Sequence, residues 1–111
     1  MRAVVARDGI VAAMPVGWAL QEGWRRGDPR VPLARAAEAV ETLCELAGGA
    51  SRVGLGTDFD GGQGAESAPD GIDTIADLPK IGDKLRARGL GEDEAAGVLG
   101  GNWLRWLRGW L

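Results

Sequence analysis

The chain has 111 residues, a length that fits one domain. Thirteen Lys and Arg against sixteen Asp and Glu give a net charge of −3, so no basic excess is present to neutralise the phosphates of a nucleic acid. There is no His, and Cys44 is the only cysteine. An internal disulfide, a Ser-His-Asp triad, a Cys-His dyad and an imidazole-ligated zinc are therefore excluded for this chain.

No targeting segment is visible in the sequence. The longest apolar stretch near the start, residues 9–15, is far too short to span a bilayer and lacks the continuous apolar core of a signal peptide. We therefore expect a cytoplasmic protein with no membrane anchor. The sequence leaves an oligomer open.

The first third of the chain reads as a helix end, a strand and a long loop. Residues 1–8 look like the end of a helix, and residues 10–14 form a short apolar run typical of a strand buried on both faces. Residues 15–31 are irregular and rich in Gly and Pro. Trp18 and Trp24 are expected to fix this loop to the body of the protein.

A helix and a second strand follow. Apolar residues recur every three or four positions over residues 33–47, which predicts a helix that Gly48-Gly49 ends. Cys44 lies on the apolar stripe of this helix, so we expect a buried, unreactive thiol. Residues 52–57 predict the second strand.

The last third of the chain is expected to be helical. Residues 75–88 carry apolar side chains at helical spacing, and Pro79 divides them into a short turn and a helix proper. Residues 92–99 predict a short helix that ends at a Gly pair, after which Asn102 would cap the last helix.

The terminal residues 103–111 alternate tryptophan with leucine, while Arg105 and Arg108 share one side. Helices that lie in a membrane interface have this pattern. Nine residues with two cations make a weak anchor, however. We therefore expect a terminal helix that packs on the body of the protein.

Strand–helix–strand with two short apolar strands predicts a β-α-β unit in a parallel sheet. Two parallel strands are too few for a stable sheet, and a parallel sheet needs cover on both faces. The chain therefore looks like part of a larger α/β architecture. Its exposed strand edges predict association with another chain.

The best candidate site is the acidic segment that ends the second strand. Asp58 and Asp60 lie two residues apart at this end of the strand, so that one could face a barrel mouth while the other holds the loop. Gly61 and Gly62 permit a sharp turn there. An acidic turn that only closes the strand is the alternative, and spacing alone does not exclude it.

Two other interpretations of this region fail on spacing. An EF-hand would need a Glu at the position of Pro69. A dinucleotide-binding fingerprint would need a third glycine at the position of Phe59.

Residues 53–61 have the sequence VGLGTDFDG. This block resembles the VGxGSDFDG segment of the renal (membrane) dipeptidase family, the M19 metallopeptidases. In the same order follow similarities to its P-x-G-L-E-D, YPxLxxxLLxRGYS and GGNxLRV segments, at residues 69–73, 78–90 and 100–105. Residues 2–11 resemble its IRAIAxxGGVIG segment.

The resemblance implies an α/β fold, the C-terminal portion of a (β/α)8 TIM barrel of the amidohydrolase type, with about two strand–helix units plus C-terminal helices. Residues 1–111 would form one partial domain. In the complete family a binuclear zinc centre bridges a hydroxide that attacks the peptide carbonyl of a dipeptide. An Asp at the end of the eighth strand orients the nucleophile and carries a proton to the leaving amine. By motif this catalytic residue is Asp58, with Asp60 and Gly61 supporting the loop.

The sequence also departs from the family pattern at the metal and substrate sites. The zinc ligands of the family are a His-x-Asp, a Glu and two later His, and this chain matches none of these motifs. The substrate-binding Arg also has no counterpart, so substrate-binding residues stay unknown. We expect no metal in this chain alone. The chain would be the C-terminal segment of a zinc-dependent dipeptidase, whose partners are the dipeptide and a missing N-terminal barrel segment. The alternative is a truncated, non-catalytic fragment or interaction module.

Overall fold

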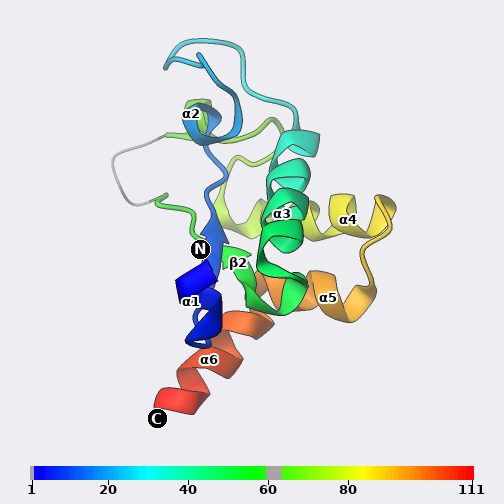
Figure 1. Ribbon diagram of the computed structural model, residues 1–111. Coiled ribbons are helices and arrows are strands. Elements are labelled where there is room, and N and C mark those ends of the chain that lie inside the picture. The colour runs from blue at the N-terminus through cyan, green and yellow to red at the C-terminus, as the bar shows by residue number, and fades with distance from the viewer. Residues whose placement is uncertain (1, 60–63) are drawn as a thin grey trace.

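The computed structural model describes residues 2–59 and 64–111 (Figure 1). Two short parallel strands, β1 (Val11–Ala13) and β2 (Val53–Leu55), form the sheet found in this part of the chain, with Val11 opposite Val53. The long helix α3 (Leu33–Ala47) connects them and packs against both. The predicted β-α-β unit is therefore confirmed.

The other helices surround this unit. Helix α1 (Arg2–Ala6) precedes β1, and the short helix α2 (Gly17–Leu20) lies in the connection between β1 and α3. After β2 come α4 (Pro79–Ala87), α5 (Glu92–Ala96) and α6 (Asn102–Trp110), with a wide turn at Gly97–Gly101. Short 3₁₀ turns cover Ala50–Arg52, Ala65–Ser67 and Ile75–Asp77. No helix in the described residues is long and apolar enough to cross a membrane.

Helix α3 follows its prediction to the residue. Its apolar stripe buries Ala36, Ala37 and Val40. Gly48 ends it in the left-handed conformation at φ 81°, which glycine adopts without strain. Cys44 is half-buried rather than buried, and burial, with a smaller contribution from nearby glutamates, raises the pKa of its thiol. A raised pKa keeps this thiol protonated at neutral pH.

The N-terminal region departs from its prediction in two ways. Ala12 on β1 is exposed, because no described segment covers that face of the strand, so β1 is not buried on both faces. The loop of residues 15–31 contains α2, whereas the sequence predicted it to be irregular. The Trp24 indole is buried against Gly17 and donates to the Pro29 carbonyl at 2.8 Å, so it fixes the loop as expected. Trp18 keeps 54% of its surface exposed.

Asn102 is not a helix cap, contrary to its prediction. The helical backbone breaks at Gly100, with φ 175°, and resumes at Gly101, so Asn102 is already helical, at φ −66° and ψ −44°. The buried side-chain amide nitrogen donates to the carbonyls of Ala50 and Val53, both at 2.7 Å. One residue later, the Trp103 indole nitrogen donates to the Leu55 carbonyl at 3.1 Å.

These bonds cover one edge of the sheet. The Gly56 amide donates to the Ala13 carbonyl at 2.9 Å, so Gly56 faces β1. Because backbone groups alternate along a strand, the carbonyls of Val53 and Leu55 face the opposite edge. Asn102 and Trp103 satisfy those carbonyls, so this edge of β2 is not exposed, contrary to expectation.

The terminal helix packs on the body through its first part. Asn102 is buried, and Trp103 and Trp106 are half-buried, whereas the other end of α6 projects from the body (Figure 1). The expectation that this helix packs on the body is therefore confirmed for its first part, and its far end does not pack.

The close approach of Trp103 to β2 requires the glycine at position 54. A Cβ on Gly54 would lie 2.5 Å from the Trp103 indole nitrogen, closer than real Cβ contacts allow. We expect Gly54→Ala to lower the free energy of unfolding by about 1–3 kcal/mol through overpacking, measured by urea denaturation. Gly109→Ala on α6, where a Cβ meets nothing within 4 Å, is the control and should not destabilise. Equal stability of the two variants would contradict this packing.

Candidate functional site

Asp58 lies at the carboxyl end of the sheet, three residues beyond β2. Its φ is 53°, in the left-handed region that few residues other than glycine adopt, although aspartate does so more often than most. The chain therefore turns sharply at this residue, and its side chain is exposed. Residues held in this region cluster at functional sites.

The strand that leads to Asp58 is shorter than the sequence predicted. It ends at Leu55 rather than at residue 57, and the chain turns at Asp58. Asp60 and Gly61 lie outside the described residues, as does Gly62. Asp58 is therefore the one member of the predicted site that the structure describes.

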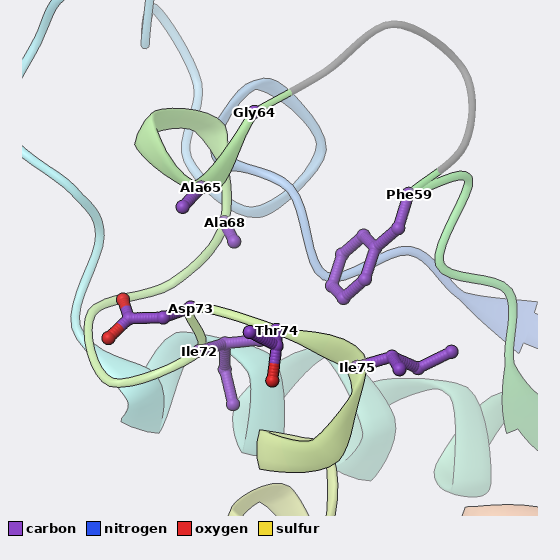
Figure 2. A pocket seen from close by; sticks show the side chains of 8 residues that line it. All are labelled: Phe59, Gly64, Ala65, Ala68, Ile72, Asp73, Thr74 and Ile75. Atoms are coloured by element: carbon purple, nitrogen blue, oxygen red, sulfur yellow. The ribbon is translucent and has the colours of Figure 1, made fainter.

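A pocket of about 220 Å³ is lined by Phe59, the residue after Asp58, and Figure 2 shows the side chains around it. The Phe59 ring, directly after Asp58, extends over this pocket and is half-buried against the core. The lining is largely apolar, with one carboxylate and one hydroxyl: Phe59, Gly64, Ala65, Ala68, Ile72, Asp73, Thr74 and Ile75.

The wall of this pocket is fastened by Arg30, a residue that sequence reasoning missed. Its guanidinium donates to the carbonyls of Ala68 at 3.1 Å, Pro69 at 2.6 Å and Ile72 at 2.7 Å. It also pairs with Asp73 at 2.8 Å. An arginine inside a Gly- and Pro-rich loop carries no periodic or motif signal, because its partners lie about forty residues away and are mostly backbone carbonyls.

The end of the same wall is held by a capping arrangement. The Asp77 carboxylate accepts from the amides of Asp73 at 2.9 Å and Thr74 at 3.2 Å, and pairs with Lys80 at 3.1 Å. The Asp73 amide bond, followed by Lys80 and the Thr74 amide, lowers the pKa of the Asp77 carboxyl. These bonds fix the segment between the pocket and α4.

The described residues do not fit a zinc pair. Among residues 2–59 and 64–111, no three or more His, Cys, Asp or Glu side chains come together as a group that could hold a metal ion. Asp58 alone supplies too few ligands, and the chain has no imidazole.

Comparison with known proteins decides the family. A model of the membrane dipeptidase family (peptidase family M19) matches residues 1–109. The chain belongs to this family. The resemblance stated from the sequence motifs is thereby confirmed, and the family is one of hydrolases.

Two relatives place this family member among longer proteins. The dipeptidase aclJ of Aspergillus oryzae (strain ATCC 42149 / RIB 40) is 37% identical over 73 residues, which cover 66% of this chain and 16% of that protein. A crystal structure of an amidohydrolase from Pseudomonas aeruginosa aligns with a TM-score of 0.75 and 25% identity, covering 94% of this chain and 37% of the other. The chain thus spans well under half the length of either relative.

Removal of the Arg30 guanidinium should release the pocket wall. We expect Arg30→Ala to cost about 2–3 kcal/mol of stability, because buried carbonyls lose a charged donor. Exchange of the Asp70 amide hydrogen, which is bonded to the Val31 carbonyl at 2.8 Å, should accelerate in the same variant. Arg26→Ala, an exposed arginine of the same loop, is the control. Unchanged exchange at Asp70 in Arg30→Ala would refute this role.

The Asp77 carboxylate should add an acid-sensitive contribution to stability. Because its folded-state pKa is lowered, the contribution is present above the ordinary pKa of aspartate and is lost as the pH falls through the folded-state value. We therefore expect Asp77→Asn to remove part of the loss of thermal stability below about pH 5. The effect should shrink in high salt, since the carboxylate is solvent-accessible. If Asp77→Asn lost thermal stability below about pH 5 as the unaltered chain does, this contribution of Asp77 would be contradicted.

Proposed function

We propose that this chain supplies the proton-transfer carboxylate, Asp58, to an active site that hydrolyses the peptide bond of dipeptides. The observation that carries the proposal is the place of Asp58. It lies in a left-handed turn at the carboxyl end of a parallel strand, within the segment TDFDG of a membrane dipeptidase family member. Barrel enzymes hold their active sites at that end of the strands.

Hydrolysis of a peptide bond requires two proton transfers, and one carboxylate can perform both. Hydrolysis adds water to the peptide carbonyl, and the attacking water must lose a proton. The amine that leaves must gain one. A carboxylate beside both atoms can accept the first proton and deliver the second, so Asp58 would act as general base and then as general acid.

The zinc pair of the family has no place among this chain's described residues, so its ligands must come from other segments. We propose that those segments also supply the remaining strands of a (β/α)8 barrel. The uncovered side of β1 supports this. A groove of about 390 Å³ lies there, lined mainly by apolar side chains of β1, α2 and α3, and Ala12 faces it.

A non-catalytic interaction module is the second candidate, and one observation favours it. Closure of a barrel would require another strand to pair with β2, but the carbonyls of Val53 and Leu55 at that edge are already bonded to Asn102 and Trp103. A sheet whose β2 edge is covered and whose β1 edge is open can bind a partner chain at β1 without forming an enzyme.

A chimera with the fungal dipeptidase separates the two candidates. The segment of aclJ that matches this chain would be replaced by the corresponding residues of this chain, which include Asp58. We expect the chimera to hydrolyse a dipeptide. Asp58→Asn should lower kcat at least about 100-fold, because a general acid–base residue contributes that much.

The controls concern folding and the isolated chain. Asp70→Asn, a change at an exposed aspartate of the next loop, should leave kcat unaltered. The isolated chain should show neither stoichiometric zinc nor dipeptide hydrolysis. A chimera with native circular dichroism whose activity is indifferent to Asp58→Asn would overturn the catalytic role and leave the interaction module.

A further inference from the structure

The projecting end of α6 carries an apolar surface that no described residue covers. Leu104 and Leu107 keep 49% and 48% of their surfaces exposed, and Trp110 keeps 76%. With Leu111, which is fully exposed, they form what we call the α6 face. Apolar residues gathered in this way on one helix end mark an interaction surface rather than scattered exposure.

A basic groove adjoins the α6 face. It has a volume of about 490 Å³, and three arginines from distant parts of the sequence meet the tryptophans of α6 there. The groove is lined by Arg7, Asp8, Arg52, Arg105, Trp106, Gly109 and Trp110. In Figure 1, α1 and α6 lie side by side at this end of the molecule.

The positive charge of this groove is only partly compensated. Arg52 pairs with Asp8. Arg105 donates to neutral groups, the Ser51 carbonyl at 2.5 Å and the Asn102 side-chain oxygen at 3.3 Å, which leaves its charge in place. Asp93 and Glu94 line a separate groove that also touches Arg105, and no acidic residue follows Glu94 in the sequence. The region is therefore cationic in a chain of net charge −3.

The tryptophans of α6 form a continuous row of rings along the helix, and Trp110 belongs both to the basic groove and to the α6 face. The Trp103 and Trp106 rings meet edge to face with centroids 6.1 Å apart, and Trp106 and Trp110 lie 5.8 Å apart. Indole rings have an apolar body and a polar N–H, so they are favoured at the boundary between lipid headgroups and acyl chains.

We propose that this end of the molecule binds an anionic lipid surface. The α6 face enters the headgroup boundary, and Arg7, Arg105 and Arg108 contact lipid phosphates. A short amphipathic helix is a weak anchor by itself, but an apolar insertion combined with a basic patch supplies the two signals that stable peripheral binding needs. The structure adds Arg7 to the two arginines of the helix, which the sequence order does not reveal.

The same charges disfavour a second copy of the chain as the occupant. In a two-fold symmetric contact the α6 faces would meet, and Arg105 and Arg108 of both copies would flank the contact without an acidic residue on α6 to pair them. An anionic lipid surface supplies both negative charge for these arginines and an apolar interior for the α6 face.

The proposed orientation also leaves the candidate site accessible. Arg7 and Arg52 precede β1 and β2, so the basic groove lies at the amino ends of the strands, whereas Asp58 lies beyond their carboxyl ends. A lipid surface bound through α6 would therefore leave Asp58 directed away from the membrane.

Vesicle sedimentation of the purified chain tests the proposal. We expect binding to vesicles of phosphatidylcholine with phosphatidylglycerol, little binding to phosphatidylcholine alone, and loss of binding at high salt. Arg108→Glu should weaken binding at least about tenfold, because each basic residue near an anionic surface contributes about fivefold and this change alters two charges. Trp110→Ala should weaken it through lost insertion and abolish part of the blue shift of tryptophan fluorescence.

Arg26→Glu is the matched control, since it makes the same charge change at an exposed loop position remote from α6. It should bind as the unaltered chain does. Equal binding to neutral and anionic vesicles, or equal weakening by Arg26→Glu and Arg108→Glu, would overturn the proposal. So would absence of vesicle binding, with or without dimerisation or capture by an acidic protein.

Discussion

The buried side chain of Asn102 is the contact on which the arrangement of this chain depends. Its amide nitrogen has two hydrogens, and both are used, on the carbonyls of Ala50 and Val53. Its oxygen accepts from Arg105. A carbonyl left buried without a donor costs about 1–3 kcal/mol, so this one amide holds the start of β2 against the beginning of α6. Gly97 leaves the room that the amide needs, because a Cβ there would lie 2.8 Å from the Asn102 oxygen.

Asn102 and Arg30 fix the two segments that flank the candidate site. Asn102 fixes the amino end of the strand that leads to Asp58, from a residue far along the chain. Arg30 fixes the loop beyond Asp58, whose residues line the adjoining pocket. Both use side-chain donors on backbone carbonyls, which is how irregular segments without ladder partners satisfy their polar groups. The site therefore depends on segments before and after it rather than on the two-stranded sheet alone.

The sequence predicted the parts of this structure that depend on local patterns. The bounds of α3, the division of the later helix at Pro79 and the parallel strand pair follow from periodicity and from proline and glycine chemistry. The motif around Asp58 identified the family, which the match to the family model confirms. Local patterns cannot reveal Arg30 or the true role of Asn102, because each acts on carbonyls about forty to fifty residues away. The exposure of Ala12 and of the α6 end was also not predictable, since apolar periodicity shows which face is apolar but not whether anything covers it.

The β1 edge of the small sheet is open and the β2 edge is covered, so strands that extend the sheet would add at β1 before they add at β2. A strand can add beside β1 without breaking a bond of β2. A strand that adds beside β2 must first remove the Trp103 indole from the Leu55 carbonyl and from the surface of Gly54. Growth of the sheet is therefore directional, with the step at β2 delayed by the cost of displacing an aromatic ring. In such an assembly Trp103 would report closure, because its indole moves from a defined hydrogen bond to a new environment only at the last step.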